Sequence, residues 1–381
     1  MAKVVTFLGT RSDTIKLSPL IPLLARNFQH VLVHSGQHDA REMGGALCQE
    51  LGLPAPDVEL RAGSHSDARQ IAQMMLGLEQ VLLEQRPAAL VVLGGANTAL
   101  AGALTGAKLG VRVAHLEAGL RTFNLHAPEE TDRVVIDRMS HWLFAPDAAA
   151  RAHLVAEGLD AHTIHVVGST TIDACRQWAA SAGGRGTLAR LKVDPHQYLV
   201  LTLHRVENTA PDALREIVSA VNALGKLWPI VFPIHPRTLR ALPGERPFAD
   251  SVKVIPPVSY LDMLNLVRNA RALLTDSIGL QEEAAVLGIP ALIMRNETEW
   301  QRPVEAGVSI LVGNTYRSLM DRAWPTLALD TALSEMRRKA LDLPGGAALR
   351  VAQCLARDLA APNLESPVAA SDPGSTSERL S

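Results

Sequence analysis

The run His115–Thr122 (HLEAGLRT) carries the residue types best suited to chemistry. It follows the segment Gly110–Val113, which we interpret as part of a buried strand, and Glu129, Glu130 and Arg133 come shortly after it. Ligands of open α/β sheets bind at the carboxyl ends of strands. Paired carboxylates beside arginines suit proton transfer on an anionic substrate. The alternative interpretation is a capped helix start with surface ion pairs, which are common and weak.

A second candidate site is the turn Leu8–Lys16 (LGTRSDTIK). Gly9 permits a tight turn, and the helix that follows would offer free backbone amides to an anion. Arg11 and Lys16 add positive charge beside those amides. The pattern Gly-x-Gly-x-x-Gly is absent, so this turn is not a dinucleotide fingerprint. A plain strand-to-helix turn remains the alternative.

A similar turn occurs in the second half of the chain, at Thr275–Ala284 (TDSIGLQEEA). Ser277 is well placed to cap a helix, and Gly279 would let a ligand approach the backbone. Amides at this helix start could hold a diphosphate, and Glu283 could accept hydrogen bonds from ribose hydroxyls. A capping box without any ligand is the alternative.

Two histidines complete the candidate set. His204, followed by Arg205, comes after the strand Leu201–Leu203, and His235 comes after Val231–Ile234. Histidine can donate to a phosphate or move a proton near neutral pH. A lone histidine is more often structural, but both of these stand at strand ends. No pair has the spacing of a helical zinc site, so we predict no metal.

The elements that must position these residues form two βα series, which predict two doubly wound domains facing a cleft. We expect a first domain over residues 1–180 and a second over 187–343, joined by the glycine-rich stretch 181–186. A helix within 346–361 is expected to pack back on the first domain, and 362–381 is expected to be a disordered tail. The expected strands are Lys3–Leu8, His30–His34, Ala88–Leu93, Val111–His115 and Thr163–Val167, then Tyr198–Leu203, Pro229–Ile234, Lys253–Ile255, Ala270–Thr275 and Pro290–Ile293.

Composition excludes several classes of protein. A net charge of −2 gives no basic field for nucleic acid. No apolar run approaches the ~18 residues that span a membrane. The three cysteines are far apart, which argues against a disulfide framework. With no signal-peptide pattern at the N-terminus, we expect a cytoplasmic protein.

Taken in order, these motifs resemble the non-hydrolysing UDP-N-acetylglucosamine 2-epimerase family over roughly residues 3–360. Each motif alone is weak, but six or more in order are specific. The matching residues are Gly9-Thr10-Arg11 with Ile15-Lys16, Ser35–His38, His115–Thr122, Pro128-Glu129-Glu130 with Arg133, His204-Arg205 with Glu207-Asn208, His235-Pro236, Asp276-Ser277 with Gln281–Glu283, Met294-Arg295, Thr298-Glu299-Trp300 and Val304–Gly307.

The resemblance implies two Rossmann-like domains in the GT-B arrangement and inversion of C2 of a UDP-N-acetylhexosamine for surface polysaccharides. UDP would leave and re-add through a glycal intermediate, without nicotinamide or another cofactor. The expected partners are the UDP-sugar substrate and a second copy of the chain in a homodimer, with no nucleic acid and no membrane. Gln37 and His38 would lie near the family's allosteric contacts. By carry-over, the proton-transfer or stabilising groups are Glu117, Glu129 and His204, and the substrate-binding residues are Arg11, Lys16, Arg133, Arg205, His235, Ser277, Gly279 and Glu283, with the second domain holding UDP.

The chain also departs from the family. The family usually has Gly-Asp-Thr after the third strand, and its Asp is a leading acid/base candidate, whereas here Gly95 stands at that position. Losing a general acid or base typically costs about 100- to 10,000-fold in rate. The usual Pro-Glu of the first turn is Ser12-Asp13, and Ile278 replaces a glycine of the second. If that glycine needs positive φ, Ile278 would be strained.

Three hypotheses follow from these departures. The chain is a working epimerase in which Glu117, Glu129, Asp13 or a water replaces the missing Asp. Alternatively, it is a hydrolysing or transferase-like UDP-sugar enzyme on the same fold, since fold alone does not fix function. The third possibility is a UDP-sugar-binding paralogue with little catalysis.

Overall fold

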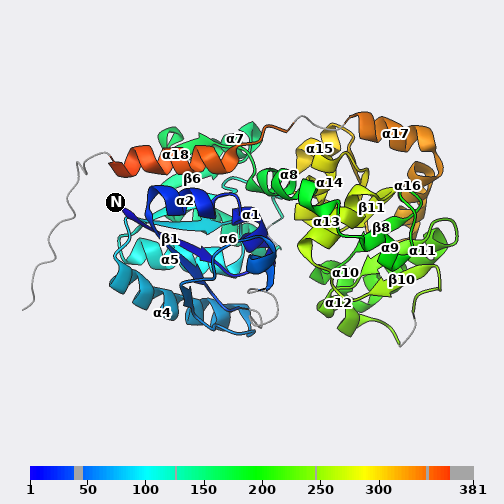
Figure 1. Cartoon of the computed structure of the whole chain (residues 1–381), viewed down its shortest axis with the longest axis horizontal. Coiled ribbons are helices and arrows are strands. Elements are labelled where there is room, and N and C mark those ends of the chain that lie inside the picture. The colour runs from blue at the N-terminus through cyan, green and yellow to red at the C-terminus, as the bar shows by residue number, and fades with distance from the viewer. Residues whose placement is uncertain (38–45, 125–126, 245–246, 340–342, 361–381) are drawn as a thin grey trace, which may run out of the picture.

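The computed structural model describes residues 1–37, 46–124, 127–244, 247–339 and 343–360. These residues build two parallel β-sheets, each with helices on both faces (Figure 1), which confirms the predicted α/β class. We refer to the parts built around the two sheets as the first and second domains. The expected disordered tail 362–381 lies outside the described residues.

The first sheet has seven strands within the described residues, in the order β3-β2-β1-β4-β5-β6-β7, all paired in parallel. The chain leaves β1 toward β3 and then returns to β4 on the other side of β1. The order therefore reverses between β1 and β4, where such sheets bind ligands. The strands are β1 Lys3–Leu8, β2 Gln29–His34, β3 Val58–Glu59, β4 Ala89–Leu93, β5 Arg112–Leu116, β6 Trp142–Ala145 and β7 Ile164–Val166.

The second sheet repeats this pattern, with the order β10-β9-β8-β11-β12-β13 and a reversal between β8 and β11. Its strands are β8 Leu199–Thr202, β9 Ile230–Pro233, β10 Val252–Ile255, β11 Ala272–Thr275, β12 Ala291–Ile293 and β13 Ser309–Leu311. Sequence patterns did not predict β3, β6 or β13, which have two, four and three residues.

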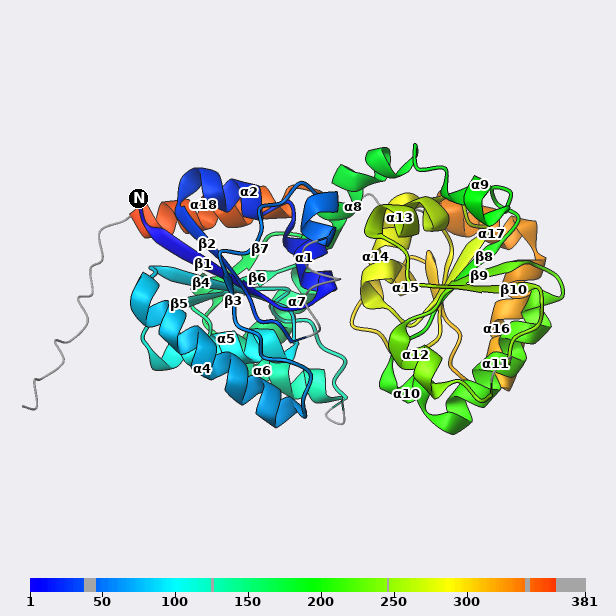
Figure 2. The same ribbon diagram turned by 60° about the horizontal axis from the view of Figure 1, so that its bottom comes forward.

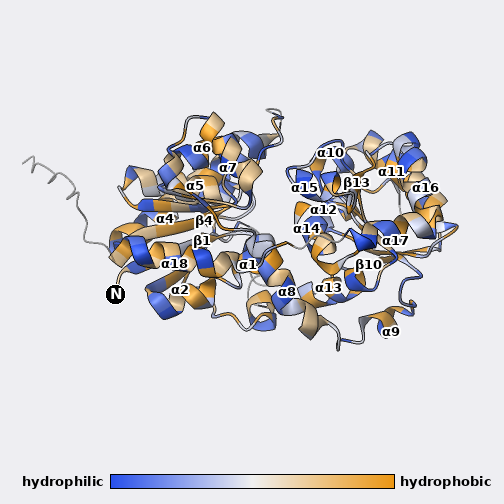
Figure 3. Cartoon of the chain, turned by 90° about the horizontal axis from the view of Figure 1, so that it is seen from above, coloured by the Kyte–Doolittle hydropathy of each residue, from blue (hydrophilic) through white to orange (hydrophobic). Residues whose placement is uncertain are grey.

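Both faces of each sheet are buried, which explains the continuous apolar runs of the strands. In β1, Val4 and Leu8 belong to one apolar cluster, while Val5 and Phe7 belong to another on the opposite face. Figure 3 shows apolar strands such as β1 and β4 enclosed by helices that carry both apolar and polar residues. The helices of the first domain are α1 Arg11–Leu17, α2 Ile21–Asn27, α4 Asp67–Gln85, α5 Asn97–Lys108, α6 Pro128–Met139, α7 Ala148–Ala156, the short 3-10 helix Ala161–Thr163, α8 Thr170–Ala182 and α18 Ala347–Ala360.

Helix α8 connects the two domains. It packs against α1 of the first domain and against α13 and α14 of the second (Figure 2). It ends at Ala182, slightly beyond the boundary expected at residue 180. The helices of the second domain are α9 Thr187–Leu191, α10 Val206–Thr209, α11 Pro211–Gly225, α12 Pro236–Ala241, α13 Tyr260–Arg268, α14 Ile278–Leu287, α15 Gln301–Glu305, α16 Tyr316–Ala328 and α17 Asp330–Arg338.

The last described helix, α18, returns to the first domain and packs against α2 (Figure 1). Val351 and Leu355 on its apolar face are fully buried in the core of that domain. Asp358 accepts a hydrogen bond from Trp142 Nε1 at 2.8 Å, and Arg350 Nε donates to the Val167 carbonyl at 2.7 Å. None of the helices in the described part of the chain is both long and apolar enough to cross a bilayer.

Candidate active site

The candidate residues lie on loops, and on the helices that follow them, after the carboxyl ends of strands of both sheets. Lys16 is in α1 after β1, and Glu117 follows β5 directly. On the second sheet, His204 follows β8 and Ser277 follows β11. Contacts between the domains place these two edges together. Arg11 Nη2, for example, donates to the Val258 carbonyl at 2.8 Å.

Lys16 and Glu117 form an ion pair between the first two candidate motifs. Lys16 Nζ lies 2.7 Å from Glu117 Oε1, and the two side chains are only 12% and 11% exposed. Burial alone would lower the pKa of Lys16, but the charges of Glu117 and Glu282 outweigh it and raise that pKa above its ordinary value. The pair therefore holds a carboxylate beside an ammonium group in a site with little water. Such an arrangement suits proton transfer next to a leaving anion.

A buried charge cluster fixes the loop that carries Glu117. The Asp137 carboxylate is fully buried and lies 2.7 Å from His115 Nδ1 and 2.6 Å from Arg121 Nη2. His115 Nε2 lies 2.9 Å from the Gly94 carbonyl, which ties β5 to the end of β4. Glu117 itself has φ +65°, an uncommon backbone conformation for a residue with a side chain. The cluster therefore holds Glu117 in an unfavourable conformation, as functional residues often are.

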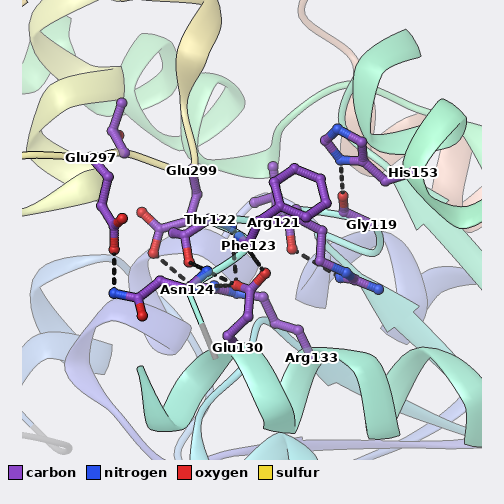
Figure 4. A network of polar contacts seen from close by, with 12 residues as sticks. Gly119, Arg121, Thr122, Phe123, Asn124, Glu130, Arg133, His153, Glu297 and Glu299 are labelled. Atoms are coloured by element: carbon purple, nitrogen blue, oxygen red, sulfur yellow. Dashed lines mark hydrogen bonds and ion pairs between the residues drawn. The ribbon is translucent and has the colours of Figure 1, made fainter. Parts of the chain in front are cut away.

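This arrangement corrects the interpretation of His115–Arg133 as a single group of substrate-facing acids and arginines. Arg121 is 3% exposed and pairs with Asp137 and with Glu157 at 2.8 Å, so it is structural. Glu130 is 1% exposed and accepts from the backbone N–H groups of Thr122 and Phe123 at 3.0 and 2.8 Å. Figure 4 shows the Glu130 carboxylate directed into this loop. Glu117, by contrast, faces Lys16.

Arg133 occupies the space next to Gly95. A Cβ atom at position 95 would lie 2.7 Å from Arg133 Cγ and 3.0 Å from the Glu129 carbonyl oxygen. The Arg133 guanidinium binds Glu130 at 2.8 Å and, in the second domain, Glu299 at 2.9 Å. Arg133 is therefore fully occupied by two carboxylates. The Glu129 side chain is exposed, and its backbone starts α6 beside Gly95.

Asp13 stabilises the turn after β1. Its Oδ2 accepts from the backbone N–H groups of Gly9 and Thr10 at 3.0 and 2.9 Å, and its own N–H donates to the Thr10 hydroxyl at 3.0 Å. This is a capping box at the start of α1, buried from solvent. Burial raises the pKa of Asp13 despite these donors. These hydrogen bonds hold the turn together, so we expect Asp13 to serve as a cap and not as the proton-transfer group.

In the second domain, the turn after β11 is unstrained and open. Ser277 caps α14 by accepting from Leu280 N–H, and Ile278 is not among the residues with positive φ. The suspected strain at Ile278 is therefore absent. A Cβ atom at Gly279 would meet no atom within 4 Å, so there is room for a ligand to approach the backbone. Glu283 lies one turn along α14, is 5% exposed, and burial raises its pKa to about 7.

The buried Asp276 orients the segment that carries His204 and Arg205. Its Oδ1 lies 2.9 Å from His204 Nδ1, and its Oδ2 accepts from the backbone N–H groups of both residues at 2.9 and 2.8 Å. Burial would raise the pKa of Asp276, but His204 and these N–H donors hold it below its ordinary value. The His204 ring is partly exposed, and its centroid lies 5.6 Å from the centroid of the His235 ring. His235 caps α12 by accepting a hydrogen bond from Arg237 N–H. The two predicted histidines are therefore neighbours.

Sequence reasoning missed several residues that organise this site. Asp137, Glu282 and Glu299 were not assigned roles, although Glu282 and Glu299 stand within motifs that were noted. Glu282 is buried, accepts from the Ser169 hydroxyl at 2.6 Å, and has its pKa raised to about 8 by burial. Asp137 gives no sequence signal, because its partners His115 and Arg121 are many residues away.

Gln37 accepts from the Thr98 hydroxyl at 2.6 Å, and His38 lies outside the described residues.

The residues around Lys16 and Glu117 do not resemble a metal centre. Within the described residues, one group of three side chains has ligand atoms within 4.8 Å of one another, namely His165, Cys354 and Asp358. It lies at the contact of α18 with β7, and Asp358 already accepts from Trp142 and Arg357. That group therefore fits a structural contact of α18.

The comparison with protein families gives one match over most of the chain. Residues 23–356 match the sequence model of a family described as UDP-N-acetylglucosamine 2-epimerase. A UDP-N-acetylglucosamine 2-epimerase of Methanocaldococcus jannaschii is 40% identical over 331 residues, which cover 84% of this chain and 90% of the relative. A UDP-2,3-diacetamido-2,3-dideoxy-D-glucuronate 2-epimerase of Pseudomonas aeruginosa is 34% identical and covers 93% of this chain and 99% of the relative.

The comparison with solved structures agrees. The M. jannaschii UDP-GlcNAc 2-epimerase, crystallised with UDP-GlcNAc and UDP, superposes with a TM-score of 0.85 at 36% identity. That match covers 93% of this chain and 99% of the crystallised chain. Since the family match, the sequence identity and the fold all agree over nearly the full length, this chain belongs to the UDP-N-acetylglucosamine 2-epimerase family.

Proposed function

We propose that this protein inverts C2 of a UDP-N-acetylhexosamine by elimination and re-addition of UDP. The observation that carries this function is the buried Lys16–Glu117 pair at the end of β5, in a member of this family. Nothing in it depends on a cofactor, since the substrate carries its own leaving group.

The reaction divides into two half-reactions. In the first, a base takes the C2 proton, the electrons of the C–H bond form a C1=C2 double bond, and the C1–O bond breaks to release UDP. In the second, a UDP oxygen attacks C1, and C2 receives a proton on the other face. The C2 hydrogen is only weakly acidic, so departure of the diphosphate must be assisted by cations and backbone N–H groups. Ser277, Gly279, Arg11, Arg205 and His235 are the proposed diphosphate ligands, and Glu283 the proposed ribose ligand.

Glu117 is our candidate for one proton-transfer group. Its carboxylate is held at 2.7 Å from Lys16 Nζ, which fixes its position at the end of β5. Glu129, which is exposed, and His204, which Asp276 orients, are the candidates for the opposite face. Since Gly95 supplies no carboxylate, these groups must do without the family's Asp.

The test is incubation of the purified protein with UDP-N-acetylglucosamine, followed by proton NMR. Formation of UDP-N-acetylmannosamine supports the proposal. Release of UDP with glycal or free sugar would instead support elimination without re-addition, which the missing carboxylate at Gly95 favours as the second candidate. UDP-sugar binding without any product would contradict both.

The substrate can also be a modified UDP-sugar of surface polysaccharides, as the name of the P. aeruginosa relative suggests. We further propose a cytoplasmic homodimer, on the resemblance to the family alone. Light scattering after size exclusion tests the dimer, and repeating the NMR assay with uronic and deoxy UDP-sugars tests the substrate.

A further inference from the structure

Glu299 connects the two domains through arginines. Its Oε2 lies 2.7 Å from Arg295 Nη1, which belongs to the same segment of the second domain. Its Oε1 lies 2.9 Å from Arg133 Nη2, on α6 of the first domain, and 3.9 Å from Arg205 Nη2. The Glu299 carboxyl is almost completely buried, and these arginines outweigh the effect of burial and hold its pKa at about 2. It is therefore a carboxylate shared between the domains.

Gly95 provides the space that Arg133 needs to reach Glu299. The backbone of Gly95 does not have positive φ, so its conformation does not require glycine. Its missing side chain matters for packing, because a Cβ atom there would lie 2.7 Å from Arg133 Cγ and 3.2 Å from Nε. The contact at 2.7 Å is with the stem of Arg133, so any larger residue at position 95 would displace the guanidinium from Glu299.

Arg133 in turn reaches the loop that carries Glu117. Its Nη1 binds Glu130 Oε2 at 2.8 Å, and the Glu130 carboxylate accepts from Thr122 and Phe123 N–H. A second contact between the domains, from Asn124 Nδ2 to Glu297 Oε1 at 2.8 Å, lies at the end of the same loop (Figure 4). The loop after β5 is therefore bound to the second domain at its far end, while Glu117 stands at its start.

We propose that Glu299 is a positioning residue for the C2 reaction. Its ion pair with Arg133, which Gly95 makes possible, holds the second domain against the Glu117 loop. This inference rests on the proposed function for its chemical consequence. A closed site keeps water from the intermediate and holds the proton-transfer group in place. Gly95 thus serves domain closure by leaving room for Arg133.

The experiment compares Gly95→Ala, Glu299→Gln and the double variant, with Glu335→Gln as the matched control. Glu335 pairs with Lys339 at 2.9 Å on the exposed surface of α17, away from the site. The readouts are kcat and KM for C2 deuterium exchange of UDP-N-acetylglucosamine in D₂O and the Kd of UDP. We expect each single variant to lower kcat about 10- to 100-fold, since small misplacements of reacting groups cost that much. The Kd of UDP should change less than about threefold.

The double variant separates a positioning role from a general loss of structure. Because both changes break the same ion pair, the double variant should be no slower than the slower single variant. Losses that multiply would overturn the proposal, as would normal kcat in either single variant. If Glu299→Gln does not fold, Gly95→Ala tests the same pair from the first domain, because it leaves every charge in place.

A second measurement does not depend on the reaction. Small-angle scattering of the wild type with saturating UDP should give a smaller radius of gyration than either variant under the same conditions. If the wild type shows no C2 exchange but this difference is present, the proposed function fails and the closure role stands. If the variants with UDP are as compact as the wild type, the ion pair does not hold the domains together.

Discussion

Replacing Asp13 distinguishes a structural from a catalytic carboxylate in the first turn. Its Oδ2 accepts from Gly9 and Thr10 N–H at 3.0 and 2.9 Å in a buried setting. A buried donor that loses its partner costs about 1–3 kcal/mol. Asp13→Ala should therefore lower the free energy of unfolding by about 2–4 kcal/mol, allowing for partial access of water to Thr10. Asp13→Asn retains an acceptor oxygen and should cost about 1 kcal/mol.

The assay pairs urea unfolding, followed by circular dichroism, with C2 deuterium exchange of the folded variants. We expect exchange rates within about tenfold of the wild type, since a group that serves as a cap is not transferring the proton, whereas loss of a general acid or base costs about 100- to 10,000-fold. Asp147→Ala is the matched control, because Asp147 caps α7 by accepting from Ala150 N–H at 2.8 Å, away from the site. A loss of more than 100-fold in Asp13→Asn with unchanged stability would refute the capping role.

The remaining predictions concern three carboxylates. Glu117→Gln should lower C2 exchange by about 100- to 10,000-fold, while calorimetry shows UDP binding retained; full activity would remove Glu117 from the mechanism. Burial raises the pKa of Glu283 to about 7, so the folded protein loses stability as the pH rises from the ordinary carboxyl range to about 7. UDP should bind more tightly over the same range, because an ionised carboxylate accepts stronger hydrogen bonds from ribose hydroxyls. Glu283→Gln should flatten both pH profiles, and unchanged profiles would contradict the assignment. The pKa of Glu299, about 2, is below its unfolded value, so its stabilisation is present above about pH 4.5 and lost as the pH falls toward 2. The difference in urea midpoint between wild type and Glu299→Gln should shrink over that range, and a constant difference would argue against the arginine contacts.

Apolar patterning was enough to predict both sheets. Strands buried on both faces read as continuous apolar runs, and their carboxyl ends carry the polar motifs. Lys16 and Glu117 were both assigned to the site, and they are paired although 101 residues separate them. The short strands β3, β6 and β13 escaped prediction, whereas β7 and β12, with three residues each, were predicted.

The sequence could not separate structural from site-facing charges within one motif. Arg121 and Arg133 look alike in sequence, but the Arg121 side chain is buried because it forms ion pairs with Asp137 and Glu157. The direction of the Arg133 side chain depends on its partner Glu299, which is 166 residues away in the other domain, and on the space left by Gly95. Side-chain direction and contacts between domains are set by packing, which local patterns do not encode.

Deuterium incorporation at C2 of UDP-N-acetylglucosamine in D₂O tests the central claim most directly, because it reports breakage of the C2–H bond whichever product accumulates. We predict that the wild type places deuterium at C2 of both the recovered substrate and the manno epimer, and that Glu117→Gln places it in neither. Full retention of the C2 proton by the wild type, with UDP-sugar bound, would contradict the proposed chemistry.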